Sequence, residues 1–511
     1  MLQFGFDGFS FDDLYRPAGL QRLHERFLAA LRESDPALAA RFTQYREAMD
    51  AGFARGGLAA PVESALLIDL AEQISRFLGR LFKLEKELEA LRKNLTSEAK
   101  LFEFKREFVS RRVFKKGATG RPSHEDLPGL DARVGLLLSL GFGVTLPPDR
   151  NKARAPFVPS EVEGWGSRPS TPLGVNGELD HERALAEATL TLMQHERTPG
   201  PGFEALRTQL LSTAEGLDVF GPSLVGEPLA QVRALLSLLE RWIWARASFT
   251  HTFHGWSTIA QPKALIPDKL VELKVAAPQT FEGPDEQLRR RDGFDLTDPR
   301  GDTRMVMGEI DYCVVCHERE KDSCRHGFKE KDPSTPLGMN GAPPYKKNAA
   351  GIALAGCPLE EHISEMHLLK GRGDSLGSLA MVMLDNPMCP GTGHRICNDC
   401  MKACIFQKQE PVNIPQIETS VLTDVLALPY GFELYGLLTR WNPLNVKRPF
   451  AAPAMGKNVL VVGLGPAGYT LAHYLLNEGF TVAGIDGLKI EPFPAELTGP
   501  GMQPIRDWKR I

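Results

Sequence analysis

The stretch 312–316, YCVVC, begins a segment that contains all eight cysteines of this 511-residue chain. The segment continues through the single cysteines Cys324, Cys357 and Cys389, and it ends in 396–404, ICNDCMKAC. A Cys-x2-Cys pair lets two thiolates reach one metal centre from a tight turn. We therefore interpret this segment as a metal or redox site around which the rest of the chain is organised.

Composition and charge place the chain among ordinary globular proteins. Hydrophobic residues make up 42% of it, charged residues 24%, and the formal net charge is −4. That charge provides no basic field, so we expect no nucleic-acid partner. No apolar run approaches the ~18 residues of a membrane span, and the N-terminus lacks the pattern of a signal peptide. We expect a cytoplasmic protein, in which cysteines are more often metal ligands than disulfides.

The regions that precede the cysteines are predicted to be largely helical. Residues 1–115 have a helical pattern, and over 67–95 apolar residues recur every three or four positions for four heptads. One helix cannot cover such a stripe by itself. An intramolecular helical hairpin or bundle is one alternative, and a coiled coil for homodimerisation or for docking of a partner is the other. Residues 116–304 form a mixed loop and helical region of unknown role, with helical patterns at 181–194 and 229–247.

The spacing of the cysteines fits two kinds of metal centre. Eight cysteines can satisfy two tetrahedral zinc ions or two 4Fe–4S clusters. Pro358 follows Cys357, an order that is common where one ligand serves a different cluster from its neighbours. The long interval between Cys324 and Cys357 also suggests ligands interleaved between two centres. These two details favour clusters, with zinc as the alternative.

A glycine-rich loop near the end of the sequence predicts a dinucleotide site. Residues 457–462, KNVLVV, have the pattern of a buried strand, and they are followed by 463–468, GLGPAG, and a helix. A second strand, 480–485, ends at Asp486, where a carboxylate would bind the ribose hydroxyls. Together these features predict the start of an α/β Rossmann-like unit over residues 455–511.

Each residue of the glycine loop has a physical role in this prediction. Gly463 permits the tight turn, Gly465 lets the backbone approach a pyrophosphate, and Gly468 lets helix and strand pack closely. Pro466 and Ala467 begin the helix, whose N-terminal N–H groups and dipole favour phosphates.

The order of these landmarks resembles the double-cluster domain of the glutamate synthase small subunit, which also opens dihydropyrimidine dehydrogenase. The similar residues are 355–365, AGCPLEEHISE, and a second block from Asn386 to Glu418. As in that family, a glycine loop follows. The resemblance covers about residues 305–490 and implies an α-helical double 4Fe–4S domain over 305–450, joined to an incomplete FAD-binding unit.

The resemblance implies two interleaved ligand sets. One cluster would be held by four cysteines: Cys313, Cys316, Cys324 and Cys404. The other would be held by three cysteines and a further ligand, with Glu418 favoured over Cys389: Cys357, Cys397 and Cys400. This chain departs from the family in its seven-residue gap before Cys324 and its long insertion before Cys357.

The resemblance also implies a function. It favours FAD over NAD at the glycine loop and implies an FAD-dependent NAD(P)H oxidoreductase. Electrons would pass between NAD(P)H, FAD and two clusters to a partner protein or a downstream domain. Because the remaining strands for FAD and a fold for NAD(P)H are missing, we expect the N-terminal portion of a longer polypeptide. The alternatives are a zinc-stapled scaffold and an electron-bifurcating or heterodisulfide-type subunit.

Overall fold

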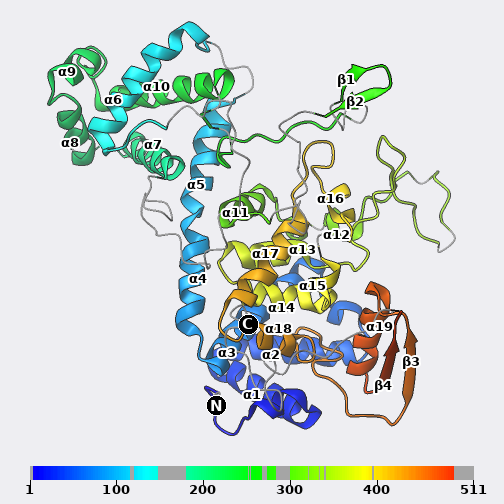
Figure 1. Cartoon of the computed structure of the whole chain (residues 1–511). Helices are drawn as coiled ribbons and strands as arrows, with labels where there is room; N and C mark the ends of the chain where they lie inside the picture. The colour runs from blue at the N-terminus through cyan, green and yellow to red at the C-terminus, as the bar shows by residue number, and fades with distance from the viewer. Residues whose placement is uncertain are drawn as a thin grey trace. The chain divides into compact units, whose positions relative to one another are not determined.

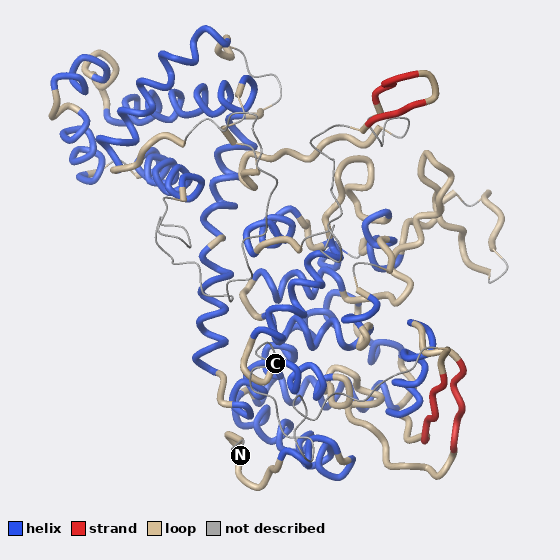
Figure 2. The backbone as a smooth tube through the Cα atoms, viewed as in Figure 1, coloured by secondary structure: helices blue, strands red, loops and turns tan. Residues whose placement is uncertain are grey.

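The structure is a computed structural model, and it is mostly helical with two small sheets (Figures 1 and 2). It describes residues 4–115, 120–147, 180–198, 200–250, 252–253, 255–266, 273–283, 300–319, 321–332, 334–338, 341–393 and 396–487. The chain divides into two compact units, Met1–Lys93 with Pro262–Ile511, and Asn94–Gln261. None of the described helices combines the length and apolar character that a bilayer crossing requires.

The first unit begins with a helical domain, which confirms the helical prediction for this part of the chain. Its long helices are α1 (Pro17–Ser34), α2 (Pro36–Asp50), α3 (Ala60–Phe82) and the start of α4 (Glu85–Ser97). Lys83 ends α3 in the left-handed conformation, with φ of 57°, so the heptad pattern is divided between α3 and α4. The stripe of α3, from Leu67 to Leu81, is buried in the core of the same unit.

The cysteine region packs on this domain as part of one hydrophobic core. Its helices are α11 (Thr303–Tyr312), α12 (Ser323–His326), α13 (Ile363–Gly371), α14 (Ser375–Asp385), α15 (Cys389–Thr392), α16 (Asp399–Lys402), α17 (Ile414–Ala427) and α18 (Gly431–Leu438). Helix α14 lies between α3 and α17 (Figure 1). The predicted domain boundaries after residues 115 and 304 therefore differ from those of the structure, because long-range packing joins the N-terminal helices to the cysteine region.

Buried polar contacts fix α13 and α14 against α3. Ser64 Oγ donates a hydrogen bond to Glu365 Oε1 at 2.6 Å, and Ser75 Oγ donates to Asp374 Oδ1 at 2.6 Å. Because an unpaired buried polar group costs about 1–3 kcal/mol, these pairs select one register of the helices. They hold the wall of the cysteine region in place.

The second unit is a separate helical bundle. Its elements are α5 (Ala99–Phe104), a π-helical segment (Lys105–Val113), α6 (Leu127–Phe142), α7 (His181–Arg197), α8 (Pro201–Leu210), α9 (Ala214–Phe220) and α10 (Pro228–Phe249). Trp242 of α10 is fully buried and donates its indole N–H to Asp131 Oδ1 at 2.8 Å. Arg246 pairs with both oxygens of the same carboxylate, which neutralises its charge.

The two sheets are short. Strands β1 (Lys274–Ala277) and β2 (Thr280–Glu282) form an antiparallel hairpin. Strands β3 (Asn458–Val462) and β4 (Thr481–Ile485) pair in parallel, with α19 (Pro466–Asn477) between them in the chain. The predicted α/β unit thus has two strands and one helix, and the described residues do not show a complete Rossmann-like fold. Residues 488–511 of the predicted unit lie outside the described residues.

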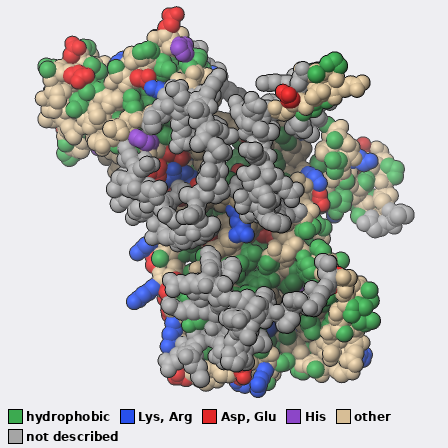
Figure 3. Space-filling model, viewed as in Figure 1, with side chains coloured by type: hydrophobic (Ala, Val, Ile, Leu, Met, Phe, Trp, Pro, Cys, Tyr) green, Lys and Arg blue, Asp and Glu red, His purple; other side chains and the backbone are tan. Residues whose placement is uncertain are grey.

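The β3–β4 pair is largely uncovered. Leu460 is 60% exposed and Val462 is 74% exposed. Figure 3 shows hydrophobic side chains on the surface around these strands. Since strands of parallel sheets are normally buried on both faces, this unit has the character of one part of a larger sheet.

A buried ion pair provides a test of this core. Lys370 of α13 is fully buried and its ammonium group donates to Asp424 of α17 and, at 3.2 Å, to Ser375 Oγ. Replacing Lys370→Met leaves Asp424 as an uncompensated buried charge, so we expect the free energy of unfolding to fall by about 3–5 kcal/mol in urea titrations. The double variant K370M/D424L should recover most of the loss. Equal stability of K370M and the wild type would contradict this packing.

The pH dependence of stability tests the burial of His24 on α1. Burial, followed by repulsion from Arg46, lowers the pKa of His24 from 6.5 to about 4. The unfolded chain therefore binds more protons, and this contribution to stability is lost as pH falls from 6.5 to 4. The steepest slope is about 1.4 kcal/mol per pH unit. His24→Leu should reduce the slope of urea stability against pH in this window, whereas replacing the exposed His124→Leu should not. An unchanged slope in H24L would show that His24 is not buried as a neutral ring.

Candidate functional site

Four cysteines from separate segments line one small pocket: Cys313, Cys316, Cys324 and Cys404. We call them the first cysteine group. The first ends α11, the second begins a short 3-10 helix, the third lies in α12 and the fourth follows α16. Apart from these thiols the pocket is walled largely by apolar side chains. Each thiol lies in or next to the terminus of a short or longer helix, and the packing of these helices brings the four thiols to one pocket.

Backbone N–H groups point at sulfur atoms of this group. The N–H of Val315, a residue with φ of 49°, donates to the sulfur of Cys313. The N–H groups of Phe406 and Val412 donate to the sulfur of Cys404. Such donors favour the thiolate over the thiol, and hydrogen bonds to sulfur also set the potentials of iron–sulfur centres. The arrangement suits sulfur atoms that carry negative charge.

A second group is formed by Cys357, Cys397 and Cys400. Burial raises the pKa of the Cys400 thiol well above its usual value, and electrostatic repulsion from the other two thiols raises it further. The sulfur of Cys357 accepts backbone N–H groups from Leu359 and Glu361. Cys397 is exposed, so this second cysteine group reaches the surface of its unit.

Two buried carboxyl groups adjoin the second cysteine group. Burial raises the pKa of Glu418 to about 7, and burial with repulsion from Glu418 raises the pKa of Glu361 well above its usual value. Asn386 donates to Glu418 Oε1 at 3.0 Å. Burial and repulsion by both carboxyl groups also raise the pKa of Cys389. Cys389 and Glu418, the two candidates for the fourth ligand, therefore lie close to each other.

Sequence reasoning missed Glu361. Glu360 and Glu361 are adjacent and chemically identical, yet the first side chain is 68% exposed and the second is buried. Glu361 stands four residues after Cys357, a spacing that could have drawn attention to it. Only the fold determines which of the two carboxyl groups faces the cysteines.

Cys324 of the first group and Cys357 of the second are in direct backbone contact, although many residues separate them in the sequence. The N–H of Cys357 donates to the carbonyl oxygen of Cys324 at 2.8 Å. The described residues between these two cysteines, 328–332, 334–338 and 341–354, lie in loop (Figure 2), and Phe328 N–H donates to the carbonyl of Leu354 at 2.9 Å. A Cβ on Gly356 would overlap the backbone at Gly327, so glycine is required at this approach.

The thiols are unsuited to nucleophilic chemistry. None of the eight cysteines is in a disulfide. Burial raises the pKa of Cys313 and of Cys357 to about 12, so both are neutral thiols in the absence of a bound cation. Reactive cysteines have lowered pKa values and partial exposure. These residues are better suited to bind a cationic centre, which would stabilise their thiolates.

The glycine loop has the conformation that the sequence predicts. Gly463 has φ of 90°, and a Cβ on Gly468 would overlap the carbonyl oxygen of Gly463. Among the described residues, no atom lies within 4 Å of the position that a Cβ on Gly465 would take. Asp486 lies at the end of β4 and accepts the N–H of Leu464 at 2.5 Å. The open space beside Gly465 is where a phosphate could meet the N-terminus of α19.

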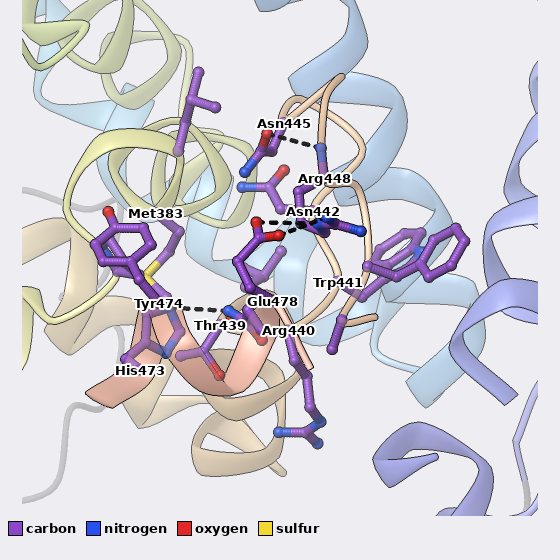
Figure 4. A pocket seen from close by; sticks show the side chains of 16 residues that line it. Met383, Thr439, Arg440, Trp441, Asn442, Asn445, Arg448, His473, Tyr474 and Glu478 are labelled. Carbon is purple, nitrogen blue, oxygen red and sulfur yellow. Dashed lines mark hydrogen bonds and ion pairs between the residues drawn. The ribbon is translucent and has the colours of Figure 1, made fainter. Parts of the chain in front are cut away.

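Helix α19 is anchored to the cysteine core by its C-terminal half (Figure 4). Arg448 pairs with Glu478, with 3.1 Å between Nε and Oε1, and Asn477 donates to the carbonyl of Thr439 at 2.9 Å. At the other end of the helix, the hydroxyl of Tyr469 lies against Gly391 of α15. The first turn of α19 is thereby held beside α15.

The described side chains form no site for a single metal ion. Within the described ranges, no group of three or more His, Cys, Asp or Glu side chains is arranged to hold one. The roles of the cysteines, Glu418 and the glycine-loop residues as ligands stay predictions.

Comparison with known proteins places a different family at the N-terminus. A family described as "RP005 N-terminal alpha-helical domain" matches residues 2–83. The uncharacterised protein RP006 of Rickettsia prowazekii is 58% identical over 113 residues, which are 22% of this chain and 16% of that protein. The chain therefore spans about one sixth of the length of this relative. No solved structure matches the chain.

The predicted relationship to the glutamate synthase small subunit and dihydropyrimidine dehydrogenase is wrong. The matching family is a helical domain at residues 2–83, no iron–sulfur or FAD family matches, and the described residues contain no metal-binding group. Short Cys-Pro-Leu and Gly-x-Gly-x-x-Gly motifs arise in unrelated chains, because each satisfies a local turn or helix requirement. Their order alone did not establish a common family.

Substitutions in the glycine loop test its packing. Gly468→Ala places a methyl group on the carbonyl oxygen of Gly463, so we expect a loss of about 1–3 kcal/mol in the stability of the β3–α19–β4 unit. Hydrogen exchange of the β3 and β4 amides should accelerate. Gly465→Ala is the matched control, since its methyl group enters open space and should leave exchange unchanged. Identical exchange in the two variants would contradict the described helix–strand contact.

Proposed function

We propose that this chain is an iron–sulfur flavoprotein segment that transfers electrons between NAD(P)H, FAD and two 4Fe–4S clusters. The proposal rests on one observation above the others. Four cysteines from four segments line a single pocket, and backbone N–H groups donate to the sulfur atoms of two of them, Cys313 and Cys404. These observations support the cysteine part of the proposal.

The chemistry of the first cysteine group fits a cluster. Four thiolates are the usual ligand set of a 4Fe–4S cluster, and Cys313, Cys316, Cys324 and Cys404 provide four. A zinc-stapled scaffold that uses the same cysteines is the alternative.

The second cysteine group provides three thiols and a choice of fourth ligand. Cys400 lies near Glu418 and Glu361, and Cys389 lies near the same two carboxyl groups. Thiolates prefer iron–sulfur centres, whereas a carboxylate is a harder ligand. When bound, clusters supply one-electron transfer, and a flavin exchanges two electrons with nicotinamide and one with a cluster.

The glycine loop supports a site for the adenine dinucleotide of FAD. The open approach at Gly465 and the start of α19 at Pro466 and Ala467 would receive the pyrophosphate. Asp486 at the end of β4 would accept hydrogen bonds from ribose hydroxyls. NAD(P)H is proposed as the electron donor, which makes the whole protein an FAD-dependent NAD(P)H oxidoreductase.

The partners and the location follow from this proposal. An electron-accepting protein or a downstream domain would receive the electrons, and a reducing cytoplasm would keep the cysteines free. A homodimer through the 67–95 heptads would have to use α4, because the α3 stripe is already buried. Leu88 and Leu91 of α4 are only partly buried and could meet a second copy.

Metal analysis of the full chain, purified without oxygen, tests the proposal. We expect iron and acid-labile sulfide for two clusters, together with absorbance near 400 nm. Cys404→Ser removes one ligand of the first cysteine group and should lower the iron content by about half, since each cluster holds the same number of irons. Cys400→Ser should have the same effect through the second cysteine group.

Two further outcomes complete this experiment. The double variant C404S/C400S should lack iron, and Cys389→Ser should keep it if Glu418 is the fourth ligand. Wild-type protein that is colourless and free of iron would overturn the proposal. Stoichiometric zinc in place of iron would support the scaffold alternative.

A further inference from the structure

A buried histidine faces the first cysteine group. His367 of α13 is 1% exposed and lines the pocket that the four thiols share. Neither of its ring nitrogens has a hydrogen-bond partner among the described residues. An imidazole in this state is unusual, because most buried side-chain polar atoms in native structures have at least one partner.

The missing partner has an energetic consequence. A buried donor or acceptor without a partner costs about 1–3 kcal/mol. Burial lowers the pKa of His367 to about 3, so the ring is neutral and carries one N–H and one lone pair in either tautomer. A group that binds in the pocket and accepts a hydrogen bond from this N–H would remove the cost.

Few other side chains that line the pocket could accept a hydrogen bond from the His367 N–H. Most are apolar: Val314, Ile363, Ile405, Phe406, Val412 and Ile414. Ser364 lies one helical turn before His367 and faces the same pocket, but its hydroxyl is engaged with His317 Nδ1 at 2.7 Å. Sulfur atoms are therefore the acceptors that the pocket brings toward the imidazole.

We propose that the imidazole N–H of His367 donates a hydrogen bond to a sulfur atom of the cluster in the first cysteine group and raises its reduction potential. This inference rests on the proposed function. A hydrogen bond to sulfur stabilises the more negative, reduced state, and it is one of the means by which proteins set cluster potentials. His367 is thus a residue that tunes the cluster without binding iron.

His24 offers a matched control. It is also buried, both of its ring nitrogens lack partners among the described residues, and burial lowers its pKa as well. Its ring lies against Phe450, with 5.6 Å between centroids, and it does not line the cysteine pocket. A substitution of His24 therefore measures the effect of removing a buried imidazole from the same core.

The experiment is a redox titration of the full chain, followed by electron paramagnetic resonance. His367→Leu should lower one of the two midpoint potentials by about 59 mV, which corresponds to a tenfold change for a one-electron couple. His367→Gln keeps an N–H donor and should stay closer to the wild type. His24→Leu should leave both potentials unchanged, and the iron content of all three variants should match the wild type.

Several results would overturn the inference. One is an iron-replete H367L protein with wild-type potentials, and another is an equal shift of both clusters. If H367L fails to retain iron, the wild type labelled with 15N-histidine is compared with H367Q by pulsed resonance. A nitrogen coupling to the first cluster that is present in the wild type and lost in H367Q supports the inference, and an identical spectrum overturns it. Wild-type protein without iron would instead overturn the proposed function, which keeps the two failures distinct.

Discussion

One backbone hydrogen bond, from the N–H of Cys357 to the carbonyl of Cys324, joins the two cysteine groups. It forms where Gly327 and Gly356 approach too closely for any side chain. The chain thus leaves Cys324 and returns to Cys357 at one fixed contact. A second link between the two groups is the segment that carries Cys400 and Cys404, and all four of these cysteines belong to one hydrophobic core.

The N-terminal helical domain packs against the region that contains the two cysteine groups. Ser64 and Ser75 of α3 bind carboxylates that begin or follow α13, and α13 carries His367 and much of the wall of the first cysteine group. Lys370 joins the same helix to α17 through a buried ion pair. Two of these contacts, at Glu365 and Lys370, hold α13 itself, and the third, at Asp374, holds the start of α14. Rigid surroundings are what a site of fixed geometry requires. The N-terminal helices and the cysteines thus share one hydrophobic core.

Sequence patterns anticipated the local features and missed the ones that depend on distant packing. The heptads predicted α3, and the glycine loop predicted the β3–α19–β4 order. The break at Lys83 carried no signal, since lysine adopts the left-handed conformation only under tertiary constraint. Burial of Glu361 and the unpartnered ring of His367 were likewise invisible, because both depend on which face of a segment meets the core.

Contacts near both ends of α19 join this helix to the rest of its unit. The helix is fixed at its C-terminal end by Asn477 and Glu478, while its N-terminal end and Gly465 stay open. Tyr469, in the first turn of the helix, rests on Gly391 of the helix that begins with Cys389. The first turn of α19 and the helix that begins with Cys389 are therefore in contact, so movement of one of them would be felt by the other.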